Sequence, residues 1–346
     1  MIILSFYDDR CYYLIIQSYS ALGVIMAKKI TVIEDETVRE ASITDFSAIA
    51  ESITVWERLT HQQYAKNTLV AFKNDWNSFL LFCIQHQTSA LPASAEIVHR
   101  YIEKMAQTRK LASLKRYIVT ISLVHRCHAL PNPCLSNEIK LAMHKQRLDK
   151  HDDYTNAHGF RDNHLQNLLE SFSHATKAKD VRDMAIWAMT FEAMLKRSEV
   201  TALTINDIEI TPEGLITLSV NGTLIALSDV ASQAINRWLT LSMIDSGFVF
   251  RRIDRHNNIG DNPLDHSSIY RIFRRASQEL ELPTDVIFSG QSPRVGASQD
   301  LADAGLSIHQ IQHQGRWRSP AMPAQYIGQR AKRDNTLKKF ANKSGK

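Results

Sequence analysis

A polar stretch, DKHDDYTN at residues 149–156, divides this chain of 346 residues into two regions with different patterns. The stretch has no apolar period, whereas before it apolar side chains recur at steps of three and four residues, as at Trp76, Phe79, Leu80 and Cys83. A single hydrophobic core seldom serves more than about 250–300 residues. We therefore predict two domains, joined by a linker at residues 149–160.

The first region predicts a compact bundle of four or five helices at residues 55–148. Apolar stripes favour helices that begin near Thr68, Ser94 and Leu114, and a further helix is expected around residues 139–148. Residues 31–52 are acidic, and we expect them to form a flexible arm with a short helix. This arm belongs to an N-terminal extension that covers residues 1–54.

The second region, residues 161–346, predicts a mainly α domain with one small antiparallel β-sheet. Two β-prone runs at residues 215–220 and 223–227 flank Asn221-Gly222, a pair that is typical of a tight hairpin turn. Helices are expected at about residues 162–175, 180–195, 198–203, 229–243, 266–280, 292–304 and 307–313.

Several functional classes are excluded because their motifs are missing. The sequence contains no GxGxxG, GxxxxGKS/T, HExxH or GxSxG, which argues against a dehydrogenase, an NTPase and a zinc or serine hydrolase. The four cysteines are scattered without CxxC pairing, so we expect no structural metal and a reducing, cytoplasmic location. No charge-free apolar run reaches about 18 residues, and we expect no membrane span.

The first 25 residues differ from the rest of the chain. They are apolar, but Asp8, Asp9 and Arg10 interrupt them where a signal peptide would carry no acidic pair. Met26 is followed by Ala-Lys-Lys, which is typical of a cytoplasmic start. We expect translation to begin at Met26; the alternative is a hydrophobic anchor.

Positive charge is concentrated in the first predicted domain. Residues 55–150 hold 14 basic and 6 acidic side chains, a balance of +8, whereas residues 1–54 and 151–346 have balances of −4 and +1. Such a block can neutralise a polyanion, and nucleic acid is the first candidate; the alternative is a solvated helical surface. The cations that we expect to meet DNA phosphates are Lys66, Lys73, Lys115, Arg116 and Arg126.

Three motifs in the second region carry the chemistry. They are LKRSEVTAL at residues 195–203, SGQSPRVGASQDL at 289–301 and GRWRSPAM at 315–322, with Tyr326 nine residues after Trp317. Their order and spacing closely resemble the catalytic domain of the tyrosine recombinase, or phage integrase, family. The resemblance extends over residues 55–342, and it implies a helical core-binding bundle and a catalytic domain that form a C-shaped clamp around DNA.

In that family a tyrosine hydroxyl attacks the scissile phosphate, which gives a 3′-phosphotyrosyl link and a free 5′-hydroxyl without metal, ATP or another cofactor. Two arginines, a histidine, a His or Trp, a hairpin lysine and an acidic residue support the charged transition state. The resemblance implies that Tyr326 is the nucleophile, Arg294 the second arginine, Trp317 the His/Trp residue and Glu199 the acidic residue. Lys196 and Gln291 stand at the first-arginine and histidine positions.

The sequence departs from the family pattern at three of these positions. Lys196 is a point charge rather than a bidentate fork, and Arg197, about 100° further around a helix, is expected to face elsewhere. Gln291 cannot hold a proton near neutral pH. No lysine occurs between Lys196 and Lys332, so the hairpin lacks its acid.

Each candidate residue also has a structural alternative. Glu199 could simply pair with Arg197 or Lys196, and Trp317 could serve only packing. Ser292 as an N-cap and Pro293 would put Arg294 in the first turn of a helix, where a cation opposes the helix dipole. That arrangement suggests a bound anion.

Two functions follow from the resemblance. The first is an enzyme, a tyrosine recombinase of a mobile element that cuts and rejoins double-stranded DNA as a homo- or hetero-tetramer on paired sites. The alternative is a catalytically impaired member that binds DNA as an accessory subunit of a recombination complex.

Overall fold

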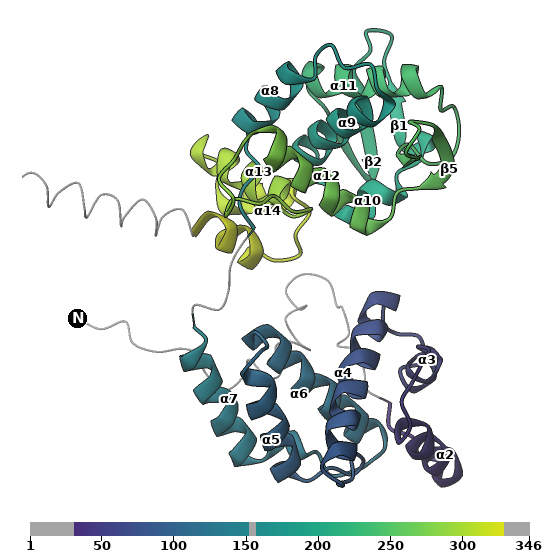
Figure 1. The fold of residues 1–346 in the computed structure, drawn as a ribbon, viewed down its shortest axis with the longest axis vertical. Helices are drawn as coiled ribbons and strands as arrows, with labels where there is room; N and C mark the ends of the chain where they lie inside the picture. Colours follow the sequence, from purple (N-terminus) through teal and green to yellow (C-terminus); the bar gives the residue numbers. More distant parts are fainter. Residues whose placement is uncertain (1–30, 152–156, 329–346) are drawn as a thin grey trace, which may run out of the picture. The chain divides into compact units, whose positions relative to one another are not determined.

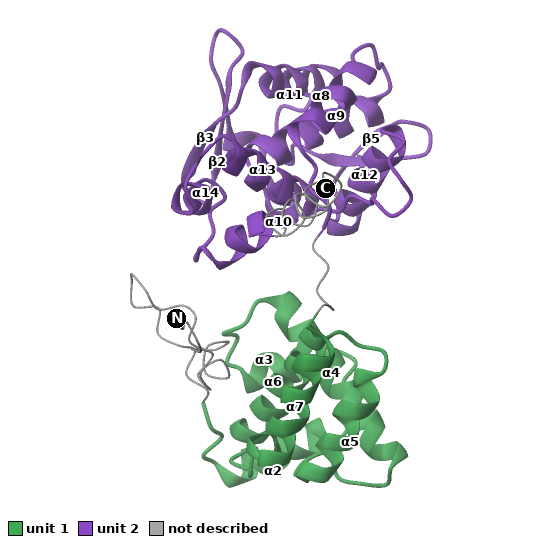
Figure 2. Ribbon diagram, turned by 90° about the vertical axis from the view of Figure 1, so that its left-hand side faces the viewer, with its two compact units in different colours: residues 1–155 green, residues 156–346 purple. Residues whose placement is uncertain are grey.

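The computed structural model describes residues 31–151 and 157–328. Contacts divide the chain into two compact units, residues 1–155 and 156–346 (Figure 2). The proposed start at Met26 and the segment before it lie outside the described residues. Among the helices of the described part, none is long and apolar enough to cross a bilayer.

The first unit is built from helices around one aromatic-rich core. Trp56, Trp76, Phe79 and Tyr101 are all at most 1% exposed. The helices are α2 (Glu36–Phe46), α3 (Thr54–Leu59), α4 (Lys66–Gln85), α5 (Ala95–Ala106), α6 (Leu111–Cys127) and α7 (Asn137–Asp149), with a 3-10 turn at Pro133–Leu135 (Figure 1).

The acidic composition of residues 31–52 had suggested a flexible arm with a short helix. The helix is present as α2, but it packs against the bundle. Asp35 caps its N-terminus by accepting from the backbone N–H groups of Thr37 and Val38. At its other end Phe46 is 2% exposed, and its carbonyl oxygen accepts a hydrogen bond of 2.9 Å from Nε1 of Trp76. Phe46, together with Ile33 and Ile43, thus fastens this segment to the core.

The second unit is mainly α with small antiparallel sheets, which confirms the predicted fold class. Its helices are α8 (Asp162–Ser171), α9 (Ala178–Glu192), α10 (Arg197–Ala202), α11 (Asp229–Ser242), α12 (His266–Glu279), α13 (Ser292–Asp303) and α14 (Ile308–Gln314), with a 3-10 turn at Ile205–Asp207. Its strands are β1 (Ile208–Ile210), β2 (Ile216–Val220), β3 (Thr223–Ala226), β4 (Arg251–Ile253) and β5 (Ile259–Pro263).

The predicted hairpin is present as β2 and β3. Val220 pairs with Thr223, and the two turn residues Asn221 and Gly222 both have positive φ, 50° and 78°. Such values match a turn that follows the twist of the strands. The prediction of one sheet was wrong in detail, because β1 adds a third strand to the hairpin and β4 pairs with β5 in a separate sheet.

Helix α9 forms the centre of the second unit. Every residue from Val181 to Phe191 is buried, and α8, α11 and α13 pack against it (Figure 1). A helix that is covered on all sides cannot move independently of its neighbours. The backbone that follows α9, at Ala193 and Met194, is therefore held in a fixed position.

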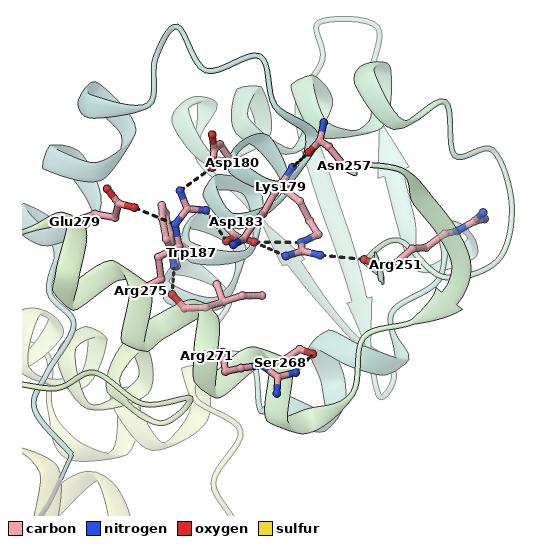
Figure 3. A network of polar contacts seen from close by, with 12 residues as sticks. Lys179, Asp180, Asp183, Trp187, Arg251, Asn257, Ser268, Arg271, Arg275 and Glu279 are labelled. Atoms are coloured by element: carbon pink, nitrogen blue, oxygen red, sulfur yellow. Dashed lines mark hydrogen bonds and ion pairs between the residues drawn. The ribbon is translucent and has the colours of Figure 1, made fainter. Parts of the chain in front are cut away.

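A network of charges fastens α9 to α12 (Figure 3). Arg275 of α12 donates to Asp180 at 2.6 Å, to Asp183 at 3.0 Å and to Glu279 at 3.0 Å. Arg182 donates to the other oxygen of Asp183 at 2.7 Å. The Asp183 side chain is fully buried, so these cations compensate a charge that water does not reach.

Candidate active site

Helix α13 presents Arg294 to the interior at its first turn. The helix begins at Ser292 with Pro293 in its first turn, and its N-cap is Gln291, one residue before the N-cap that the sequence suggested. The start of the helix is fixed because Phe160 donates its N–H to the carbonyl oxygen of Ser292 at 2.9 Å. Gly296 permits this contact, since a Cβ there would lie 1.7 Å from the carbonyl oxygen of Phe160.

Arg294 is 5% exposed and all its recorded partners are neutral. One terminal NH₂ donates to the carbonyl oxygen of Met194, and the other donates to that of Gly315 at 2.8 Å. The guanidinium stacks over the Trp317 ring, 4.3 Å from its centroid. Burial and the nearby Arg316 charge lower the pKa of Arg294 to about 10, so the group is still cationic at neutral pH.

Glu199 collects donors from three parts of the chain. Lys196 caps α10 and donates to Glu199 through its backbone N–H at 2.8 Å and through Nζ at 3.0 Å. Asn221 at the hairpin turn donates at 3.1 Å, and Arg316 donates at 3.0 Å. Burial alone would raise the pKa of Glu199, but these hydrogen bonds and the Arg316 charge outweigh it and lower the pKa. The carboxylate therefore stays ionised and orders the cations around it.

Tyr326 and Trp317 lie against each other. Their rings are edge-on, with centroids 5.9 Å apart, and Tyr326 is 4% exposed. Gln299 of α13 donates to the carbonyl oxygen of Tyr326 at 3.2 Å. The structure thus brings together Tyr326, Trp317 and Arg294, which the sequence had related by spacing.

Gln291 and Arg197 lie at the edge of this cluster. Gln291 is exposed, and its side chain has no recorded hydrogen bond within the described part of the chain. Arg197 is exposed, and its aliphatic stem packs over Gly290, the residue before Gln291. A Cβ on Gly290 would lie 2.4 Å from Cδ of Arg197.

Arg316 is a part of the site that the sequence did not predict. Its side chain is 11% exposed, and its guanidinium donates to the carbonyl oxygens of Ala193 at 2.9 Å and Met194 at 3.3 Å. Its ion pair with Glu199 spans 117 positions of the sequence. Sequence spacing could not reveal this partnership; the only available signal was that Arg316 precedes Trp317 within the third motif.

Comparisons with known proteins identify the family of the chain. A sequence model of the phage integrase family matches residues 160–333, half of the chain. The chain belongs to the phage integrase family. It is 27% identical over 305 residues to an integrase/recombinase xerD homolog of Selenomonas ruminantium, with 83% of this chain and 89% of the relative covered. It is 24% identical over 293 residues to the recombinase cre of Escherichia phage P1, with 77% and 85% covered.

Solved structures of site-specific recombinases share the fold. The XerH recombinase bound to a palindromic difH substrate superposes with a TM-score of 0.60 at 11% identity, over 90% of this chain and 91% of that one. A lambda integrase dimer bound to a COC′ core site gives 0.55 at 11% identity, over 83% of this chain and 94% of that one.

The hairpin of this chain contributes an amide at the place where the resemblance implies a lysine. Asn221 at the turn reaches Glu199, and no lysine lies between Lys196 and Lys332. Among the residues that the structure describes, no group of three or more His, Cys, Asp or Glu side chains could hold a metal ion.

The five basic residues that we expect to meet DNA phosphates fall on α4 and α6, but their charges differ in availability. Arg116 donates to Asp75 at 2.6 and 2.8 Å, and Asp75 is 3% exposed. Lys73 donates to the carbonyl oxygen of Glu51 at 2.8 Å. Within the described residues, Lys66, Lys115 and Arg126 have no recorded hydrogen bond or ion pair.

Proposed function

We propose that this chain is a site-specific recombinase that cuts and rejoins double-stranded DNA through Tyr326. The observation that carries the proposal is the packing of Tyr326, Trp317 and the buried Arg294 in one cluster with a net positive charge. A buried guanidinium with only carbonyl partners gains a stronger partner when an anion binds. A phosphodiester is such an anion.

In the proposed reaction, the hydroxyl oxygen of Tyr326 attacks the scissile phosphorus. The hydroxyl gives up its proton as a new P–O bond to the tyrosine forms and the bond to the 5′-oxygen breaks, and the leaving 5′-oxygen takes up one proton in exchange. Negative charge grows on the non-bridging oxygens, where Arg294 provides a planar fork and Lys196 a point charge. Exchange of one phosphodiester for another conserves bond energy, and the 5′-hydroxyl of a second strand reverses the step.

The proton transfers distinguish the two candidate functions. Gln291 can donate a hydrogen bond but cannot exchange a proton near neutral pH, and the hairpin turn offers Asn221 rather than an acid. A general acid or base contributes about 10²–10⁴ in rate. These two positions favour the second candidate, a DNA-binding accessory subunit that does not cleave.

We further propose that the first unit tracks the DNA backbone and that four subunits assemble on paired sites in the cytoplasm. The domain limits proposed are a core-binding domain at residues 55–148, to which α2 adds, and a catalytic domain at residues 161–346. The basic side chains of α4 and α6 and the DNA-bound relatives support a DNA partner. The dimer named for lambda integrase supports assembly on DNA.

The test is covalent capture on nicked duplexes. A binding site is first selected from random duplex DNA, and a nick next to the scissile phosphate then lets the cut fragment diffuse away and traps the protein–DNA adduct. We expect an adduct from the wild type and none from Tyr326→Phe, with nearly equal DNA affinity, because only the nucleophilic oxygen is removed. An adduct from Tyr326→Phe would overturn the nucleophile, and no adduct from the wild type would favour the accessory subunit.

A further inference from the structure

The site has a deficit of bidentate donors. Lys196 stands where the family resemblance implies an arginine, and an ammonium cannot grip two phosphate oxygens in one plane. Its side chain is half exposed and is directed to Glu199 at 3.0 Å. Of the residues that the resemblance assigns to the phosphate site, Arg294 alone carries a guanidinium.

A second guanidinium nevertheless lies beside Arg294. Arg294 and Arg316 both donate to the carbonyl oxygen of Met194, so their terminal nitrogen atoms approach the same acceptor. Arg316 comes from the turn after α14, and Glu199 holds it at 3.0 Å. We propose that Arg316 supplies the second guanidinium of the phosphate site, in place of the arginine expected at position 196.

The local charge balance supports this assignment. Lys196 and Arg316 both donate to the carboxylate of Glu199, whereas Arg294 beside them has no carboxylate partner. Two buried guanidiniums side by side repel each other, and this repulsion contributes to the lowered pKa of Arg294. A dianionic phosphorane would offset this repulsion. Its oxygen atoms would also give the two guanidiniums several acceptors, where they now share the carbonyl oxygen of Met194.

The side chain of Arg316 also has a donor without an acceptor. Its backbone φ of +54° is the left-handed value common for a residue just past the end of a helix, here α14. Its Nε is buried, and within the described part of the chain it has no hydrogen-bond partner. A buried donor without an acceptor calls for an explanation, and a bound anion would provide the missing acceptor.

The inference rests on the proposed function, and its test uses the same nicked duplex. Arg316→Lys keeps the charge but removes the fork, and we expect it to slow adduct formation by about 10²-fold. In a Lys196→Arg background the fork returns from α10, so there the same change should cost less than about 10-fold. Arg318→Lys, two positions further along the turn, is the matched control and should leave the rate unchanged.

A purely structural Arg316 predicts a different pattern. The loss would then be equal in both backgrounds and would follow the thermal midpoint, and that result would overturn the inference. If Arg316→Lys fails to fold, Arg316→Gly replaces it, because glycine suits the left-handed backbone. The same rescue by Lys196→Arg is then required.

A second readout separates this inference from the failure of cleavage. Millimolar orthovanadate, which adopts the geometry of a phosphorane, should raise the melting temperature of the DNA-free wild type and of Arg318→Lys. The shift should largely vanish in Arg316→Lys. A wild type that makes no adduct but keeps this pattern would refute the recombinase function and leave the oxyanion role of Arg316 intact. Equal shifts in all three proteins would refute that role.

Discussion

The second unit contains two clusters of arginines that differ in how their charge is balanced. In the first cluster, Arg182 and Arg275 face Asp180, Asp183 and Glu279, so two cations meet three carboxylates (Figure 3). Each guanidinium has ionic partners within the fold. This closed cluster holds α9 and α12 together.

The cluster around Tyr326 has the opposite balance. Lys196 and Arg316 share the single carboxylate of Glu199, and Arg294 has no carboxylate partner, so these three cations and one carboxylate leave a net charge of +2. Backbone carbonyl oxygens supply the remaining acceptors. Burial alone therefore does not mark an arginine as functional. A buried arginine with too few carboxylate partners is the better indicator of a binding site for an anion.

The largest effect is expected in the closed cluster. Asp183→Asn removes the fully buried carboxylate that both arginines share, and the uncompensated cations should cost about 3–5 kcal/mol of unfolding free energy. Urea denaturation measures this loss. Glu279→Gln, at the half-exposed end of the network, should cost about 1 kcal/mol or less. Equal losses would mean that the network does not depend on its buried centre.

The open cluster should respond in activity rather than in stability. Arg294→Lys removes the planar fork and should slow adduct formation by about 10²–10³-fold. Lysine keeps the charge and can still donate to one of the two carbonyl oxygens, so the unfolding free energy should fall by only about 1 kcal/mol. Arg275→Lys is the matched control and should show the reverse, with lower stability and normal cleavage per folded molecule. A large stability loss in Arg294→Lys would erase the distinction between the clusters.

Much of the fold could be predicted from the sequence because the strongest signals are local. Apolar periods locate most helices, and Asn221-Gly222 locates the β2–β3 hairpin. The strands that were missed carry no such signal: β1 has three residues, and β5 reads IGDNP with an exposed middle. These strands form because they pair with distant parts of the chain, and a short stretch of sequence carries no sign of such pairing.

The candidate site shows the same limit. The spacing of Tyr326 from Trp317 within one motif was informative, and the two rings do meet. Arg316 escaped notice because its acceptors on the α9–α10 connection lie more than a hundred residues away in sequence. Likewise, charge counting could not reveal that Arg116 is bound to Asp75 on another helix. Long-range pairing decides which charges are free.

A smaller effect is expected at Gln291, where the open cluster lacks a titratable group. Gln291→His adds an imidazole at an exposed position that has no recorded side-chain partner in the described part of the chain. Since a general acid or base contributes about 10²–10⁴, even partial alignment should raise the rate of adduct formation about 10-fold. The rate of adduct formation should then depend on pH near neutrality, whereas the wild-type rate should not. Gln291→Asn is the control. A gain without any new pH dependence would argue for simple hydrogen bonding.

The smallest effect extends the comparison to α6 of the first unit, where a free and a neutralised cation are neighbours. Lys115 has no recorded ion pair among the described residues, whereas Arg116 is held by the buried carboxylate of Asp75. A lysine that neutralises one phosphate changes the slope of log affinity against log salt by about 0.9. Lys115→Ala should therefore flatten the slope by roughly that amount, with little change in stability.

Arg116→Ala should act differently, because the main partner of this guanidinium is inside the fold. Loss of the pair leaves Asp75 uncompensated at 3% exposure, so the unfolding free energy should fall while the salt slope changes much less than in Lys115→Ala. Filter binding of duplex DNA between low and physiological salt, together with urea denaturation of both variants, separates the two outcomes. Equal changes in slope would mean that Arg116 reaches the DNA backbone despite its pairing. A charge count would then describe this surface better than its ion pairs do.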